Sequence, residues 1–167
     1  MLHFRTPDID DLEMLRAWDR EPHVIASDPH ETEIWEPEEL TEFEDWRVMW
    51  IVEDPDGIPF GFLQIIDPQK EPEQYWGDLP EGIRTLDIWI GPPEYLGKGY
   101  GTQMMKHAFR WCFQFPEVQE IWIDPVSSNV DAIRFYRRVG FEFVERKMLG
   151  KDLCDIHRFS RRNWRSE

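Results

Sequence analysis

A glycine-rich segment at residues 96–102, Leu-Gly-Lys-Gly-Tyr-Gly-Thr, has the composition of an anion-binding turn between an expected strand and an expected helix. The alternating glycines Gly97, Gly99 and Gly101 remove the Cβ atoms that would keep the backbone away from a bound phosphate. The following helix would direct its free N–H groups and the positive end of its dipole at the same point. The segment therefore predicts a pyrophosphate site, although such a turn can also be purely structural.

Two common nucleotide-binding motifs do not fit this segment. A P-loop ends in Gly-Lys-Ser/Thr, whereas Lys98 is followed here by Gly99. A dinucleotide-binding turn places its glycines directly after a strand, whereas Gly91-Pro92-Pro93 intervenes here. The expected ligand therefore belongs to a different class of phosphate-containing molecule.

A carboxylate interrupts the apolar strand that is expected at residues 85–90. Asp87 shares one face of this strand with Trp89, because side chains alternate along a strand. A buried carboxylate needs a partner, so Asp87 is a candidate for binding or catalysis, with Trp89 bordering the same pocket. Asp124 follows the next expected strand; it could complete an anionic site or simply bond the amides of its own Asp-Pro turn.

The chain carries a net charge of −15, and residues 8–45 hold 15 of its 34 acidic side chains but only two basic ones. This charge argues against nucleic acid as a partner, because nucleic-acid binding needs clustered Lys and Arg. The acidic segment could concentrate a cationic substrate, or it could only keep two surface helices soluble. Composition does not choose between these two interpretations.

The remaining composition indicates one domain over residues 1–167, and a cytoplasmic location is expected. No stretch is long and apolar enough to predict a membrane span or a secretory signal. Cys112 and Cys154 form no disulfide framework or metal-binding spacing, and His23 and His30 lie among acids without the spacing of metal ligands, so no metal is expected. The oligomeric state, monomer or homodimer, is left open.

Hydrophobic periodicity and turn residues predict an α/β (α+β) fold in the order β-α-α-β-β-β-α-β-α-β-β. The expected sheet is mixed, mostly antiparallel, with about seven strands and about four flanking helices. The second helix begins at Pro37 and should bury Leu40 and Phe43, whereas residues 67–82 contain too many prolines and glycines for regular structure. The expected strands are residues 2–6, 46–52, 60–66, 85–90, 121–123, 141–144 and 153–159, and the other helices contain residues 12–18, 100–115 and 131–139.

Two blocks of the sequence resemble the GNAT N-acetyltransferase superfamily. The segment Leu96-Gly-Lys-Gly-Tyr-Gly101 is similar to its coenzyme A pyrophosphate loop, with Gly99 and Gly101 at the two small positions and Leu96 where Gln or Arg is usual. Residues 129–141, Asn-Val-Asp-Ala-Ile-Arg-Phe-Tyr-Arg-Arg-Val-Gly-Phe, resemble its Asn-x-x-Ala-x-x-x-Tyr-x-x-x-Gly-Phe segment. The two blocks have the family's order and together cover residues 84–144.

The resemblance implies acetyl-CoA as the acyl donor. The thioester would lie where two strands of the sheet diverge, with the backbone N–H near Ile90 stabilising the oxyanion. Tyr136 would donate a proton to the departing thiolate. The residues that the resemblance assigns to the coenzyme are Trp89, Ile90, Leu96, Gly97, Lys98, Gly99, Tyr100, Gly101, Thr102, Asn129, Ala132 and Tyr136.

Within the superfamily, the chain resembles the aminoglycoside 6′-N-acetyltransferases and the siderophore-type acetyltransferases. The resemblance lies in residues 82–87, 96–102, 115–121 and 124–129. It implies that Asp87 binds the ammonium of a cationic acceptor or takes its proton, that Asp124 adds a second contact, and that Glu73 and Trp76 border the acceptor.

Three functions remain compatible with this resemblance. The first is acetylation of a primary amine on an aminoglycoside-like molecule. The second is acylation in siderophore, polyamine or lysine-type metabolism, which is favoured less because the siderophore family often has a histidine where this chain has Asp87. The third is a non-catalytic acyl-CoA-binding module, which loss of the glycines or of Tyr136 would favour, and both are retained.

Overall fold

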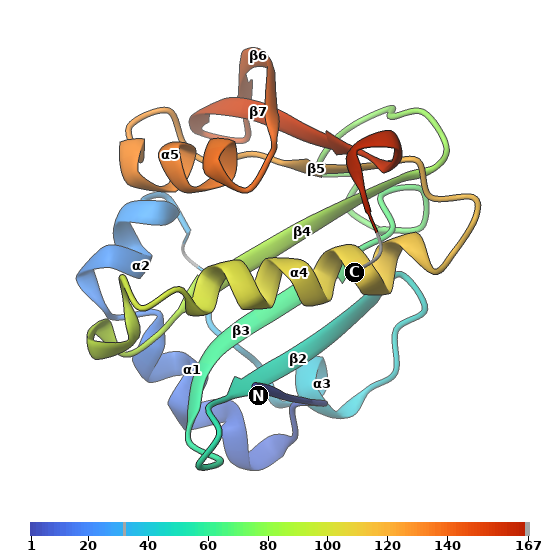
Figure 1. Ribbon diagram of the computed structural model, residues 1–167. Helices are drawn as coiled ribbons and strands as arrows, with labels where there is room; N and C mark the ends of the chain where they lie inside the picture. Colours follow the sequence, from blue (N-terminus) through green and yellow to red (C-terminus); the bar gives the residue numbers. More distant parts are fainter. Residues whose placement is uncertain (32, 166–167) are drawn as a thin grey trace.

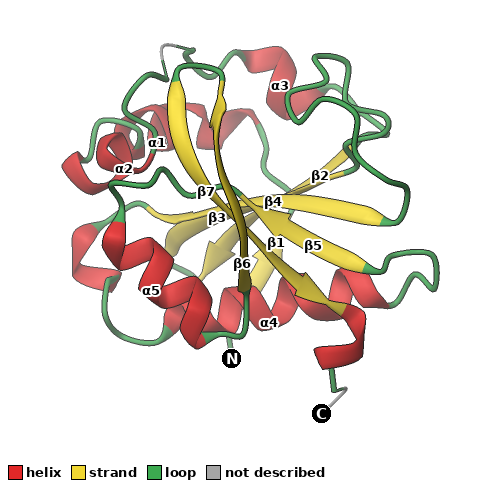
Figure 2. Ribbon diagram, turned by 90° about the horizontal axis from the view of Figure 1, so that it is seen from above, coloured by secondary structure: helices red, strands yellow, loops and turns green. Residues whose placement is uncertain are grey.

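The computed structural model describes residues 1–31 and 33–165 and contains a seven-stranded sheet with helices on both faces. Figure 1 shows α4 crossing the near face of the sheet, and Figure 2 shows α1, α2 and α3 on one side of the sheet with α4 and α5 on the other. The α-helices are α1 (Leu12–Trp18), α2 (Pro22–Ser27), α3 (Pro37–Thr41), α4 (Tyr100–Phe113) and α5 (Val130–Arg138). The strands are β1 (His3–Arg5), β2 (Arg47–Glu53), β3 (Pro59–Ile66), β4 (Ile83–Ile90), β5 (Glu120–Ile123), β6 (Glu142–Leu149) and β7 (Asp152–Ser160).

The strand order is β1-β2-β3-β4-β5-β7-β6, and only the β4–β5 pair is parallel. The predicted class, a mixed and mostly antiparallel sheet of about seven strands, is confirmed. The expected loop at residues 67–82 is also confirmed, since no helix or strand lies between β3 and β4. The N-terminal region has three short α-helices where two were expected, because Pro22 starts an additional helix after α1.

Two apolar layers cover the sheet. The alternation expected along β4 is confirmed, because Leu86, Ile88 and Ile90 pack with Met104 and Met105 of α4, whereas Trp89 packs on the opposite face with Leu15 and other residues of the α1 side. The face that carries Trp89 is therefore the α1–α3 face, and the other is the α4–α5 face.

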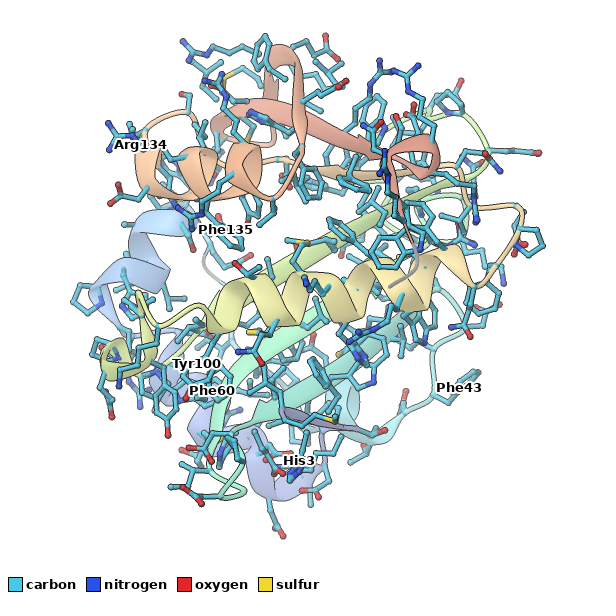
Figure 3. The ribbon with its side chains drawn as sticks, viewed as in Figure 1. His3, Phe43, Phe60, Tyr100, Arg134 and Phe135 are labelled. Carbon is cyan, nitrogen blue, oxygen red and sulfur yellow. The ribbon has the colours of Figure 1, made fainter. Side chains whose placement is uncertain are left out.

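The prediction that Phe43 would be buried beside Leu40 is wrong. Leu40 is buried, but α3 ends at Thr41 and Phe43 is 92% exposed. Figure 3 shows its ring projecting away from the body of the molecule. The helical spacing that related the two residues in the sequence does not hold, because Glu42 already has extended backbone angles.

Candidate active site

The glycine-rich segment forms a turn before the N-terminus of α4. Gly97 (φ 71°) and Gly99 (φ 82°) have left-handed backbone angles, and Gly99 is the N-cap of α4. A Cβ atom built on either residue would contact nothing within 4 Å, so both face open space. The first N–H groups of α4 have no partners within the helix and are directed at this turn. These features fit a bound pyrophosphate in the way the sequence predicted for Gly97 and Gly99.

Gly101 has a different physical role from the other two glycines. A Cβ atom on Gly101 would lie 3.3 Å from the ring of Phe135, so this glycine allows α5 to approach α4 closely. Gly97 and Gly99 thus leave open space beside the turn, whereas the space beside Gly101 is used for packing between α4 and α5. Figure 3 shows Phe135 on the part of α5 that faces α4.

Aromatic rings support the turn from the side of the sheet. Phe60 of β3 stacks on Tyr95 with ring centroids 4.8 Å apart and lies equally close to the ring of Tyr100 (Figure 3). The Tyr95 hydroxyl donates to Asp54 Oδ2 at 2.8 Å, and Lys98 lies over the Tyr95 ring. Tyr100, assigned to the coenzyme by resemblance, is thus also part of the packing that fixes the backbone of the turn.

Strands β4 and β5 diverge next to this turn. Their parallel ladder has only three pairs and ends at Thr85 opposite Trp122, although β4 continues to Ile90. The N–H of Gly91 donates to the Phe60 carbonyl on β3, so by alternation the N–H and C=O of Ile90 point to the open side. Beyond Thr85, β4 therefore offers backbone groups that β5 does not use, including the Ile90 N–H that the resemblance assigns to the thioester.

A histidine that the sequence analysis did not select lies at this open edge. The Nε2 atom of His23, in α2, donates to the Ile90 carbonyl at 2.7 Å. Trp18 of α1 packs on the next residue so closely that a Cβ atom at Gly91 would lie 2.2 Å from its indole ring. The N-terminal helices therefore hold the end of β4 in place.

Two carboxylates lie where the strands diverge, Asp87 within β4 and Asp124 directly after β5. Asp87 and Asp124 are each two residues beyond the last paired residues, Thr85 and Trp122, so both side chains face the α1–α3 side of the opening. Asp87 Oδ2 accepts a hydrogen bond from Gln64 Nε2 at 2.8 Å. Burial and the nearby charge of Asp87 raise the pKa of Asp124 to about 7. The structure thus brings together the two acids that the sequence selected.

Tyr75 is the loop residue that contacts this acidic pair. Its hydroxyl donates to Asp124 Oδ2 at 2.7 Å, so the Asp124 carboxylate is not confined to its own turn. The sequence analysis selected Glu73 and Trp76 in this loop. Glu73 is exposed, and Trp76 is only 6% exposed and packs beside Trp122. Neither has a contact with Asp87 or Asp124 among the described interactions, and the irregular loop gives no periodicity by which to select Tyr75.

Further acids extend this anionic region toward the N-terminal helices. Burial and the charges of Glu31, Asp152 and Asp87 raise the pKa of Asp28 to about 6. His30 Nδ1 lies 2.5 Å from Asp152 Oδ1 and so links the segment after α2 to the β6–β7 hairpin. Asp28 of the acidic N-terminal segment thus lies close enough to Asp87 for their charges to interact.

Tyr136 lies on the other side of the opening. It lies in α5, and its ring is close to the rings of Phe135 and Phe141. It is partly buried and packs against the hydrophobic core beneath α4. Burial, followed by the charges of Asp124 and Asp87, raises its pKa above the usual range, so the phenol stays protonated at neutral pH. A protonated phenol close to two carboxylates can serve as a proton donor.

Asn129 and Ala132 begin α5. The Asn129 side chain accepts from the Ala132 N–H at 3.2 Å and caps the helix. This contact occupies one lone pair of the amide oxygen and leaves the amide NH2 for other partners. Leu96 is exposed and Thr102 lies in the first turn of α4, whereas Trp89, also assigned to the coenzyme by resemblance, packs on the α1–α3 face of the sheet, away from the glycine turn.

No group of three or more His, Cys, Asp or Glu side chains in residues 1–31 and 33–165 is arranged to hold a metal ion. Across that same part of the chain, no helix combines the length and the apolar character needed to cross a membrane.

Known proteins share both sequence and fold with this chain. The aminoglycoside N(6′)-acetyltransferase type 1 of Klebsiella pneumoniae is 34% identical over 87 residues, which are 52% of this chain and 43% of that protein. The spermine/spermidine N(1)-acetyltransferase of Bacillus subtilis is 31% identical over 70 residues, 42% of this chain and 46% of that protein. The matches therefore span less than half the length of these two relatives.

The fold comparison extends over nearly the whole chain. The crystal structure of aminoglycoside acetyltransferase AAC(6′)-Ib in complex with coenzyme A and kanamycin superposes with a TM-score of 0.82 and 26% identity, covering 97% of this chain and 96% of that one. The family model for the acetyltransferase (GNAT) domain matches residues 8–149. The chain therefore belongs to the GNAT acetyltransferase domain family.

Proposed function

We propose that the protein transfers the acetyl group of acetyl-CoA to a primary amine of a cationic small molecule, with an aminoglycoside-like 6′-amino group as the acceptor. The observation that carries this proposal is the opening between β4 and β5. The glycine turn and Tyr136 lie on its α4–α5 side, and Asp87 and Asp124 lie on its α1–α3 side. Donor and acceptor can therefore approach one reaction centre from opposite faces of the sheet.

Acetyl-CoA would be held by the backbone of the turn. N–H groups from Gly97 to Thr102 would bind the pyrophosphate, and the Ile90 N–H would bind the thioester carbonyl. Family membership and the coenzyme A in the AAC(6′)-Ib complex support this donor. When bound, the coenzyme supplies an activated acyl group; the chain supplies orientation and proton transfer.

Each proton and bond in the transfer has an assigned partner. The acceptor arrives as an ammonium ion, which Asp124 and Asp87 attract, and Asp87 takes the proton that frees the nitrogen lone pair. The amine nitrogen then bonds to the thioester carbon and loses its second proton to solvent, and the carbon–sulfur bond breaks as the oxyanion collapses. Asp87 returns the first proton to solvent. Tyr136 delivers a proton to the departing sulfur and is reprotonated from solvent. The products are the N-acetylated amine, coenzyme A and one released proton.

The comparisons support a cationic acceptor. One neighbour is a complex with kanamycin and others are complexes with paromomycin or ribostamycin, and each of these ligands is a polycation at neutral pH. The anionic region formed by Asp28, Asp87, Asp124 and Asp152 matches that charge. A linear polyamine is a second candidate acceptor, because a spermine/spermidine acetyltransferase is among the relatives and the region extends well beyond Asp87.

A coenzyme A release assay with a panel of amines tests this function. We expect acetyl-CoA turnover with kanamycin or spermidine but not with neutral alcohols. Asp87→Asn should lower turnover with the active amine by at least about 100-fold, the low end of general-base catalysis. It should leave the dissociation constant of acetyl-CoA nearly unchanged, since Asp87 lies on the acceptor side. Unchanged turnover in this variant would rule out Asp87 as the base.

A further inference from the structure

A chain of polar side chains runs across three strands behind Asp87. Gln64 of β3 lies directly opposite Asp87 of β4 in the sheet register, and its Nε2 donates to Asp87 Oδ2 at 2.8 Å. Arg47 of β2 continues the chain, because its Nη1 donates to Gln64 Oε1 at 3.2 Å. Both ends of the Gln64 amide are therefore engaged, one by a donor and the other by an acceptor.

This arrangement fixes which way the Gln64 amide points. Because Arg47 can only donate, the amide oxygen must face Arg47 and the NH2 group must face Asp87. Without Arg47 the amide could rotate and direct its oxygen at the carboxylate, where two acceptors would repel each other. Arg47 thus acts on Asp87 through Gln64 as well as through its own charge.

Arg47 is itself anchored by α3 and the segment that follows. Its side chain is only 7% exposed, its Nη2 lies 2.5 Å from Glu44 Oε2, and its Nη1 lies 3.8 Å from Glu39 Oε1. A buried guanidinium is retained only when carboxylates compensate its charge. Two acids of the N-terminal segment thereby hold a cation next to the acceptor side of the sheet.

The second oxygen of Asp87 is left available. In residues 1–31 and 33–165, Gln64 is the one hydrogen-bond donor to this carboxylate, and it uses Oδ2. Burial raises the pKa of Asp87 above its usual range, whereas the Gln64 hydrogen bond and the Arg47 charge oppose that rise. Five acidic groups interact electrostatically with Asp87. They lie directly after α2, in the 67–82 loop, directly after β5 and on α5, and they are Asp28, Glu71, Tyr75, Asp124 and Tyr136.

We propose that Gln64 and Arg47 are positioning residues that orient the Asp87 carboxylate and keep it available as a proton acceptor. Gln64 holds Oδ2, so Oδ1 is presented to the acceptor ammonium. Among the described residues, the acidic groups that interact with Asp87 outnumber Arg47, the one cation whose charge acts on it, so loss of this support would leave Asp87 protonated at a pH where the reaction needs it ionised. The inference rests on the proposed function, in which Asp87 accepts the proton.

The decisive measurement is the titration of Asp87 by carbon NMR in protein labelled with [4-13C]aspartate, with the signal identified by its loss in Asp87→Asn. We expect Gln64→Leu to raise the titration midpoint of Asp87 by roughly one pH unit or more. Gln64→Glu, which keeps the side-chain shape, should raise it further because two adjacent carboxylates cannot both ionise easily. Arg47→Met should raise it, and Arg47→Lys should raise it less.

Gln114→Leu is the matched control, because Gln114 is exposed directly after α4 and, within residues 1–31 and 33–165, its amide bonds the Trp111 carbonyl alone. It should leave the midpoint unchanged. The acidic limb of kcat/KM for kanamycin should move with the NMR midpoint in the Gln64 variants, while the Kd of coenzyme A stays within about twofold of the parent value.

Two outcomes separate this inference from the proposed function. If both Gln64 variants fold and Asp87 keeps its parental midpoint, the positioning role is wrong even if acetyl transfer occurs. If the midpoint shifts as expected but neither kanamycin nor spermidine is acetylated, the effect on the carboxylate stands and the proposed acceptor is wrong.

Discussion

The pyrophosphate site can be tested by a pair of glycine variants that share the same backbone strain. Gly99 has φ 82° in the turn before α4, and Gly57 has φ 81° in the turn between β2 and β3. A Cβ atom at either position would contact nothing within 4 Å in the free protein. Gly99→Ala and Gly57→Ala should therefore have the same cost in stability and differ only in what the new methyl group meets when coenzyme A binds.

The expected loss of stability follows from the left-handed backbone angle, and the expected loss of coenzyme A affinity follows from the methyl group that would enter the space beside Gly99. A non-glycine residue in the left-handed region costs about 1–2 kcal/mol. For a domain of this size, each kcal/mol lowers Tm by about 2–4 °C, so both variants should lose roughly 2–8 °C. Loss of one backbone hydrogen bond to a charged phosphate costs about 1.5–3 kcal/mol, so Gly99→Ala should weaken coenzyme A binding about 10- to 100-fold.

Isothermal titration calorimetry with coenzyme A, together with thermal unfolding, measures both effects. The Kd of coenzyme A for Gly57→Ala should stay within about twofold of the parent value, although this variant should lose as much Tm as Gly99→Ala. If Gly99→Ala also kept the parental Kd, the space beside Gly99 would not be where the pyrophosphate binds. If both variants lost affinity equally, the effect would come from strain rather than from contact.

Three other perturbations test the neighbouring parts of the site. Gly91→Ala should destabilise the protein by about 1–3 kcal/mol in urea unfolding, because its Cβ would lie 2.2 Å from the Trp18 ring; unchanged stability would refute this packing. Tyr136→Phe should lower kcat about 100-fold with little change in the KM of acetyl-CoA, and a normal kcat would exclude a general-acid role. Because the pKa of Asp124 in the folded protein is about 7, above its unfolded value, this carboxyl favours folding below its unfolded pKa, and that contribution is lost as pH rises toward 7. Asp124→Asn should remove this part of the pH dependence of unfolding, which parallel melts between pH 4 and 8 would detect; identical curves would contradict the raised pKa.

Much of the fold could be predicted because local patterns agree with tertiary contacts. The alternation along β4 and the turn residues around α4 correspond directly to the burial observed. The short N-terminal helices were less predictable, since α2 buries none of its residues fully and so gives no clear apolar period. The β6 strand runs to Leu149, whereas the sequence predicted an end at Val144. Most β6 side chains are exposed and give no apolar pattern, and the strand is instead held by its pairing with β7.

Residues of the candidate site could be predicted only where the residue type or its spacing in the sequence is itself the signal. Asp87 stood out as a carboxylate in an apolar strand, and the glycines stood out by their spacing. Gln64, Tyr75 and His23 did not, because their roles come from contacts with residues 23, 49 and 67 positions away in the chain. Strand register and loop path create these contacts, and neither can be read from local composition.

The most direct test of the account is a crystal structure of the protein with coenzyme A. We expect phosphate oxygens within hydrogen-bonding distance of backbone nitrogens in residues 97–102, and the thiol at the opening between β4 and β5 near Ile90 and Tyr136. A coenzyme bound elsewhere, or a turn that stays closed to it at saturating concentration, would contradict both the donor site and the transfer reaction built on it.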